Sequence, residues 1–247
     1  MFSKQFLNFA GQFKRNMDRK RYVIIMAAGS GTRMGAEIPK QFIELEGKAI
    51  LQRTMEKFVE ACPGIRVVTV LPESHIEYWK NYCLSRSFTC PQILVKGGIT
   101  RFHSVRNALE KVPEGALVAV HDGVRPMISR ELIRNMFDEA EGVDGLVPVV
   151  PCVDTMKMLR RSGDTLEPVP DAVADRSLLY GVQTPQIFRS EIIKAAYMQA
   201  YDTAFTDDAS VVEKYGKNLS YTIGERFNIK ITTQDDLKIA RALMSRD

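Results

Sequence analysis

The sequence is poor in the residues that most often bind metals or form disulfides. Its 247 residues include three histidines and four cysteines, and no two cysteines stand in a C-x-x-C pair. This excludes zinc-finger spacing and favours free thiols in a cytoplasmic protein. No apolar run approaches the ~20 residues that a helix needs to cross a bilayer, so we expect no membrane partner.

An excess of positive charge is also absent outside the N-terminus. The net charge is +4, but residues 1–22 alone carry +5, which leaves −1 for the rest of the chain. We therefore expect no nucleic-acid partner, and any anion site must be a local cluster of charges. Residues 1–20 mix phenylalanines with basic residues. We predict a flexible extension over 1–20 and a single domain over 21–247.

One stretch near the N-terminus carries a chemical signal. The apolar run 23–28 is typical of a buried strand, and it leads into a loop with Gly29 and Gly31, followed by Arg33 and Lys40. The glycines alone indicate an ordinary turn between a strand and a helix. With the two cations added, the stretch favours phosphate binding, because backbone N–H groups can cradle phosphate oxygens while cations neutralise their charge.

Strands and helices are predicted to alternate as far as residue 150. The expected strands lie at 23–28, 66–71, 92–95, 117–120 and 145–150. One helix is expected to begin near residue 47, and three more are expected over 74–86, 100–109 and 129–141. This order predicts an α/β fold with a Rossmann-like, mostly parallel sheet flanked by helices on both faces. The glycine loop, Gly97-Gly98 and Asp122 all follow strand ends, where ligands bind in such sheets.

The alternation fails after this point. Residues 152–159 and 166–173 are predicted to be extended around a turn, which indicates a protruding β-arm over about 152–174. An arm of this length with few apolar residues usually packs on a partner chain. Beyond it, we predict a strand over 180–188, a helix over 190–201, a helix capped by Asp207 and Asp208, a strand over 228–232 and a helix over 234–245.

Seven motifs occur in a distinctive order. They are residues 27–34 with 39–41, 97–105, 120–126, 154–157, 183–186, 206–210 and 228–230. Together they resemble the 2-C-methyl-D-erythritol 4-phosphate cytidylyltransferases of the non-mevalonate isoprenoid pathway, over residues 21–245. The resemblance implies transfer of CMP from CTP to 2-C-methyl-D-erythritol 4-phosphate, with Mg²⁺ or another divalent cation as cofactor. It also implies a homodimer in which the arm interlocks two subunits.

The resemblance implies a role for each matched residue. The catalytic set would stabilise the α-phosphate and orient the attacking phosphate: Arg33, Lys40, Arg176 and Lys230. The nucleotide-binding set would be Ala27, Ala28, Gly29, Gly31, Gly98, Arg101 and Ser104. The set around the polyol phosphate would be Asp122, Arg125, Thr155, Thr184 and Thr206. Asp122 would also hold the metal ion. His121 is interpreted as a structural residue.

Other functions stay open from the sequence. Ile99 and Phe227 stand where many relatives carry acidic residues, and residues 227–233 resemble the ribitol-5-phosphate cytidylyltransferases. Ribitol 5-phosphate or another polyol phosphate is therefore an alternative acceptor. A nicotinamide-dependent dehydrogenase would need G-x-G-x-x-G, but its third glycine position is Met34. The retained cations argue against a non-catalytic nucleotide-binding module.

Overall fold

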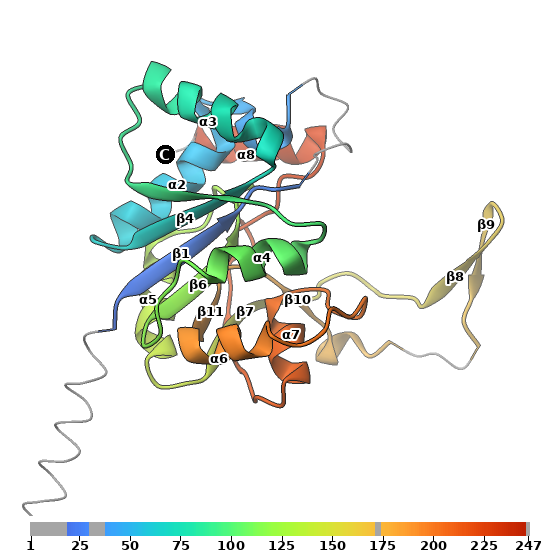
Figure 1. Cartoon of the computed structure of the whole chain (residues 1–247). Coiled ribbons are helices and arrows are strands. Elements are labelled where there is room, and N and C mark those ends of the chain that lie inside the picture. The colour runs from blue at the N-terminus through green and yellow to red at the C-terminus, as the bar shows by residue number, and fades with distance from the viewer. Residues whose placement is uncertain (1–18, 30–37, 171–173, 246–247) are drawn as a thin grey trace, which may run out of the picture.

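One eight-stranded sheet forms the centre of the fold (Figure 1). The structure is a computed structural model, and it describes residues 19–29, 38–170 and 174–245. The strand order is β10-β7-β11-β6-β1-β4-β5, and β12 pairs with β7. The strands are β1 (Arg21–Met26), β4 (Arg66–Leu71), β5 (Gln92–Lys96), β6 (Leu117–Asp122), β7 (Gly145–Pro151), β10 (Tyr180–Val182), β11 (Gln186–Arg189) and β12 (Ser220–Ile223). β1 runs parallel to β4 and β6, whereas β11 runs antiparallel to β6 and β7.

Helices cover both faces of this sheet, which confirms the predicted α/β architecture. They are α2 (Ile50–Ala61), α3 (Glu73–Ser85), α4 (Arg101–Leu109), α5 (Arg130–Ala140), α6 (Ser190–Ala196), α7 (Asp208–Lys214) and α8 (Gln234–Met244). Successive side chains of a strand point to opposite faces. Val23 and Ile25 therefore pack with α2, α3 and α5, while Tyr22 and Ile24 pack with α4, α6 and α7. Such two-sided burial explains the continuous apolar run in the sequence.

The carboxyl ends of the four neighbouring parallel strands meet at one edge of the sheet. β1, β4, β5 and β6 are all parallel in this part of the sheet. Backbone hydrogen bonds continue beyond the strand ends, from Ala27 N to Val70 O (2.9 Å), Gly97 N to Leu71 O (2.8 Å) and Gly123 N to Met26 O (2.9 Å). These bonds fix the starts of all three loops that the sequence places at a ligand site.

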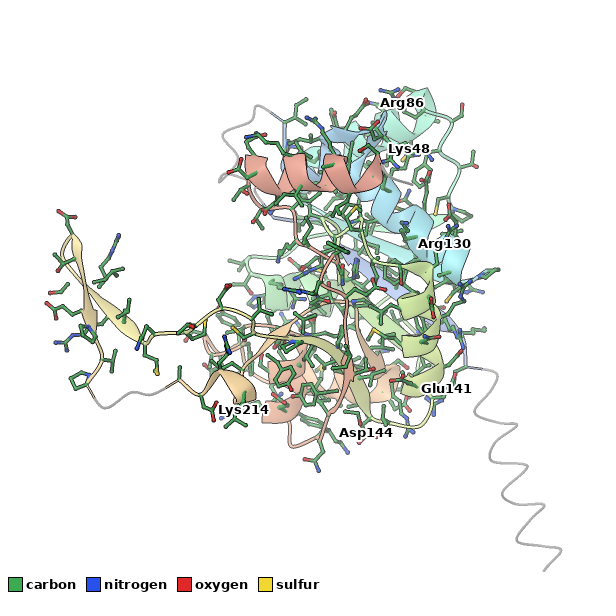
Figure 2. The ribbon with its side chains drawn as sticks, turned by 180° about the vertical axis from the view of Figure 1, so that it is seen from behind. Lys48, Arg86, Arg130, Glu141, Asp144 and Lys214 are labelled. Carbon is green, nitrogen blue, oxygen red and sulfur yellow. The ribbon has the colours of Figure 1, made fainter. Side chains whose placement is uncertain are left out.

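The predicted arm is present but is less regular than expected. Its hairpin consists of β8 (Leu159–Ser162) and β9 (Thr165–Pro168), joined through Gly163 at φ +60°. Residues 152–158 form no strand, so the prediction of an extended strand over 152–159 is wrong except at its last residue. Figures 1 and 2 show the hairpin standing clear of the body in opposite views. Residues 171–173, and residues 1–18 of the extension predicted over 1–20, lie outside the described residues.

Four further predictions differ from the structure. The helix expected from about 47 begins at Ile50, because Glu44–Leu45 (β2) and Lys48–Ala49 (β3) form a small hairpin. The strand expected over 180–188 is split into β10 and β11 around the cis peptide Thr184-Pro185. The helix expected over 190–201 ends at Ala196. The strand expected over 228–232 is absent, and the missed strand β12 lies at 220–223.

No helix within the described ranges 19–29, 38–170 and 174–245 is long and apolar enough to cross a membrane.

Candidate active site

A cleft lies at the carboxyl edge of the parallel strands. Its cavity is about 350 Å³. Among its described lining residues, the charged side chains are three cations, Lys40, Arg101 and Lys230, and one carboxylate, Asp122. The excess of cations in a concave site favours an anionic ligand.

The first wall of the cleft is the end of β1 and the residues just after it. Gln41 lies in a short 3-10 helix, η2 (Lys40–Phe42), and its side chain is 1% exposed. Its Nε2 donates to Ala27 O at 2.9 Å. Gln41 therefore ties Lys40 and the start of the glycine loop into one unit. The predicted site residues Gly31 and Arg33 lie outside the described residues.

The second wall is the Gly97-Gly98 turn before α4. A Cβ added to Gly98 would meet His103 Cβ at 2.5 Å, so this close approach of two backbones requires glycine. Gly98 N donates to Ser104 Oγ at 2.9 Å, and Ser104 Oγ donates to Thr100 O at 2.9 Å. The hydroxyl proton of Ser104 is therefore used to hold the turn, and Ser104 can offer the ligand only an acceptor. Thr100 caps α4.

The third wall is centred on Asp122, the last residue of β6. Its Oδ2 lies 3.0 Å from Arg125 Nε and 3.1 Å from Lys230 Nζ. Burial alone would raise the pKa of this carboxyl, but Lys230, Arg125 and Arg101 outweigh burial and hold the pKa well below its ordinary value. Asp122 is consequently ionised at neutral pH.

His121 stands behind this carboxylate as a neutral group. It is fully buried, and burial lowers its pKa from 6.5 to about 4. Its Nε2 lies 3.3 Å from Arg125 O, and a carbonyl oxygen can only accept, so Nε2 carries the proton. A buried neutral imidazole that supports the Asp122 turn agrees with the structural role inferred from the sequence.

Two motifs late in the chain hold Asp122 in place. Asp122 N donates to Thr184 Oγ1 at 3.1 Å, and Arg125 Nη1 donates to Asn228 O at 2.8 Å. Asn228 is fully buried, and its Nδ2 donates to Thr184 O at 2.9 Å. Ile231 N also donates to Val124 O at 2.9 Å. These bonds bring Lys230 to Asp122 without a strand, which is why residues 228–232 are conformationally fixed but unpaired in the sheet.

The comparisons with known proteins agree on one family. The family model described as 2-C-methyl-D-erythritol 4-phosphate cytidylyltransferase (IspD) matches residues 22–246. A protein of that name from Phocaeicola vulgatus is 44% identical over 91% of this chain and 99% of its own length. Another from Porphyromonas gingivalis is 43% identical over 93% of this chain and 100% of its own length. The chain belongs to the 2-C-methyl-D-erythritol 4-phosphate cytidylyltransferase family.

Solved structures of cytidylyltransferases share the fold. The 4-diphosphocytidyl-2C-methyl-D-erythritol synthase of Anaerococcus prevotii superimposes with a TM-score of 0.75 at 28% identity, over 94% of this chain and 99% of its own. The Francisella tularensis 2-C-methyl-D-erythritol 4-phosphate cytidylyltransferase gives a TM-score of 0.74 at 29% identity, over 90% and 99%. These matches confirm the predicted enzyme class and count against a dehydrogenase or a non-catalytic module.

The structure brings most of the predicted cytidylyltransferase site together. The predicted residues that line the cleft are Ala27, Ala28, Gly29, Lys40, Gly98, Arg101, Ser104, Asp122 and Lys230. Arg125 and Thr184 lie behind it, in contact with Asp122. Thr155, Arg176 and Thr206 are exposed and do not line the cleft of their own chain. Arg176 instead donates to Val153 O at 3.1 Å, at the base of the arm.

Several supporting residues were missed in the sequence. Gln41 and Asn228 lie beside predicted residues, but a neutral amide gives no charge signal that would single it out. Asp208 was interpreted as a helix cap, and this is wrong. Asp207 caps α7, accepting from Ser210 N at 2.9 Å, whereas the side chain of Asp208 is fully buried and pairs with Arg101.

Proposed function

We propose that this protein transfers CMP from CTP to 2-C-methyl-D-erythritol 4-phosphate, giving 4-diphosphocytidyl-2-C-methyl-D-erythritol and pyrophosphate. The observation that carries the proposal is the cleft that three cations, Lys40, Arg101 and Lys230, line together with one ionised carboxylate, Asp122. A triphosphate and a phosphate monoester bring several negative charges into one place, and an excess of cations compensates them. The name of the curated relatives states the same acceptor.

The proposed reaction needs electrostatic stabilisation more than proton transfer. An oxygen of the acceptor phosphate forms a bond to the α-phosphorus of CTP. The bond from that phosphorus to the oxygen bridging to the β-phosphate breaks, and its electron pair leaves with pyrophosphate. A phosphate monoester is anionic near neutral pH, so the nucleophile needs no general base. Arg33 and Lys40 are proposed to stabilise the charge on the α-phosphate, and Lys230 and Arg176 to orient the attacking oxygen.

The two glycine-containing walls are proposed to bind the nucleotide. The backbone of residues 27–29 and Gly31 would line the phosphates, because N–H groups that follow a strand end can donate to phosphate oxygens. Ala27 would do so without its own N–H, which donates to Val70 O at 2.9 Å. Gly98 and Ser104 would contact the cytosine. Because the Ser104 proton is donated to Thr100 O, Ser104 Oγ would accept from the exocyclic amino group of the base rather than donate to its carbonyl.

Asp122 is proposed to hold Mg²⁺ or another divalent cation. The donor set fits such an ion, because Mg²⁺ is commonly bound through one or two carboxylates together with phosphate oxygens. Asp122 is ionised, and it is the one carboxylate among the described residues that line the cleft. When bound, the ion would supply positive charge that neutralises part of the triphosphate charge. Lys230 and Arg125 orient the carboxylate for this contact.

A homodimer is proposed to complete the acceptor site. Apolar side chains are exposed beside the base of the arm and surround a hollow of about 700 Å³: Leu178, Tyr180, Val182, Tyr221 and Ile223. An exposed apolar patch of this kind marks an interaction site. A second copy covering it would let Thr155 and Arg176 reach the other subunit's cleft, where Thr206 would join them at the acceptor phosphate. Removal of residues 160–166 should then weaken the dimer in sedimentation, and an unchanged profile would contradict this interface.

The four cysteines support a location for the proposed enzyme. Cys62, Cys83, Cys90 and Cys152 are all free thiols. Free thiols are typical of reducing compartments, and we therefore propose a cytoplasmic location.

The experiment that tests the function is an assay of pyrophosphate release. Each of the four common nucleoside triphosphates is supplied with Mg²⁺ and either 2-C-methyl-D-erythritol 4-phosphate or ribitol 5-phosphate. We expect turnover with CTP and the methylerythritol phosphate. Turnover with ribitol 5-phosphate but not with the methylerythritol phosphate would identify ribitol 5-phosphate as the acceptor. If no pair of substrates gives metal-dependent pyrophosphate, the transferase function is refuted.

A further inference from the structure

Arg101 reaches the cleft from an unusually constrained position. It is the first residue of α4, and its Nη1 and Nη2 donate to Asp208 Oδ1 and Oδ2 at 2.8 and 2.5 Å. The side chain of Asp208 is 0% exposed, whereas that of Arg101 is 34% exposed toward the cleft. A planar guanidinium held by two parallel bonds cannot rotate independently of the carboxylate, so Asp208 fixes its orientation.

A second buried group fixes Asp208 in turn. Tyr197 Oη donates to Asp208 Oδ1 at 2.6 Å. Tyr197 is 1% exposed, and its ring stacks on Phe102 with centroids 4.7 Å apart. Burial and the adjacent Asp208 charge raise the pKa of Tyr197 well above 10, so the phenol remains a hydrogen-bond donor at physiological pH. The carboxylate is thus held between an aromatic donor and the guanidinium.

The network also joins two loops of the proposed site. Arg101 follows the Gly98 turn at the start of α4, and Asp208 is the first residue of α7, directly after Thr206 and Asp207. The pair Arg101–Asp208 therefore sets the spacing between the nucleotide wall and the loop proposed to contact the acceptor.

We propose that Asp208 and Tyr197 are positioning residues that act through Arg101. They hold its guanidinium in the orientation that CTP requires and hold the Gly98 turn at a fixed distance from the Thr206 loop. This inference rests on the proposed function, because it takes the ligand of the cleft to be CTP. A positioning role differs from a purely structural role in one respect. Without the Arg101 guanidinium the carboxylate of Asp208 has nothing to position, so its effect on nucleotide binding should depend on Arg101.

A double-mutant cycle separates the two roles. Asp208→Asn, Arg101→Gln and the double variant are compared for KM and Kd of CTP, kcat and Tm. Asp208→Asn should raise the KM and Kd of CTP by about tenfold, with a smaller change in kcat, because an interaction used for binding is lost. In the Arg101→Gln background the same substitution should change KM by less than about twofold. Additive effects on KM, or a lower Tm with unchanged KM, would overturn the proposal.

Two further variants keep the test decisive if Asp208→Asn folds poorly. Tyr197→Phe removes one hydrogen bond and keeps the ring, and it should raise the KM of CTP about threefold, again only when Arg101 is present. The matched control is Asp138→Asn, which breaks the Arg21–Asp138 pair (2.7 Å) at the start of β1, away from the cleft. It should leave KM unchanged. An inactive wild type would refute the proposed function, whereas an active wild type with a Tyr197→Phe effect independent of Arg101 would refute this inference alone.

Discussion

Among the described residues that line the cleft, one carboxylate, Asp122, stands against three cations. Asp122 is held by Arg125 and Lys230 through the same oxygen, Oδ2, and its pKa lies well below the ordinary value. A single carboxylate is a weak site for a strongly hydrated divalent ion, which usually needs phosphate oxygens as additional ligands. The described part of the chain offers no group of three or more acidic, histidine or cysteine side chains for a metal.

Metal binding should therefore require the nucleotide. Calorimetric titration of Mg²⁺ into the protein should give no saturable signal at millimolar concentration without CTP. Titration in the presence of a non-hydrolysable CTP analogue should give one site. Asp122→Asn should abolish this second signal. Tight binding of Mg²⁺ to the protein alone would show that other ligands exist and would contradict the role given to Asp122.

Lys40 should carry part of the transition-state stabilisation. Gln41, its neighbour in η2, donates to Ala27 O, so Lys40 is held close to the residues that follow β1. Lys40→Ala should lower kcat by at least ~10², the scale observed when one transition-state donor is removed. Steady-state pyrophosphate release measures this effect.

A surface lysine supplies the matched control. Lys48 lies in β3 on the surface seen in Figure 2, and its Nζ pairs with Glu56 at 2.9 Å. Lys48→Ala should leave kcat within about twofold of wild type. Equal losses of kcat in both variants would indicate a nonspecific effect of removing a lysine. A near-normal kcat of Lys40→Ala would show that Lys40 does not stabilise the transition state.

Among the structural elements, the loops at the strand ends depend on each other. A Cβ added to Gly97 would lie 2.7 Å from Ala28 Cβ, a contact that only a backbone shift can relieve. Gly97→Ala should push the second wall of the cleft away from the first. We expect the KM of CTP to rise by about tenfold and the free energy of unfolding to fall by about 1–3 kcal/mol. Steady-state kinetics and urea denaturation measure the two effects.

A glycine in an open turn provides the comparison. A Cβ on Gly142 would find its nearest neighbour, Glu139 O, at 3.8 Å, which is an ordinary contact. Gly142→Ala should therefore change neither KM nor stability appreciably. If Gly97→Ala also leaves KM unchanged, the two walls do not cooperate in nucleotide binding.

Regular elements could be predicted from the sequence where burial leaves a local pattern. The strand over 66–71 was predicted with its observed bounds because it is a continuous apolar run that is buried on both faces. The helix over 234–245 was predicted to within one residue because its apolar spacing reports the face it buries. The strand predicted over 228–232 is absent because hydrogen bonds fix Ile231 to Val124 and Asn228 to Thr184. Both partners lie more than 40 positions earlier in the chain. Such long-range contacts leave no periodic pattern.

The site could be predicted only in part for a related reason. Cations and glycines next to strand ends are visible in the sequence, and most of them do line the cleft. The partner of a buried ion pair is not visible. Asp208 follows a helix cap and has the residue type of a cap, yet its carboxylate binds Arg101, 107 positions earlier in the chain. Only the packing of α7 against α4 decides between the two roles.

At the scale of the whole molecule, two of the three proposed site residues that are exposed and do not line the cleft of their own chain belong to the arm or its base. Thr155 lies in the arm and Arg176 lies at its base, in η3 (Arg176–Leu178). Figures 1 and 2 show the arm directed away from the body. If these residues serve the cleft, they must serve that of a second subunit, and each active site then combines Lys40 of one chain with Arg176 of the other.

Mixing two inactive variants tests this arrangement. Lys40→Ala and Arg176→Ala homodimers should each have little activity. After unfolding and refolding of an equimolar mixture, about half of the dimers are mixed, and one of the two sites in each combines an intact Lys40 with an intact Arg176. The mixture should therefore recover about a quarter of the wild-type rate. If Arg176 served its own chain, every site of a mixed dimer would carry one substitution, and mixing would restore nothing.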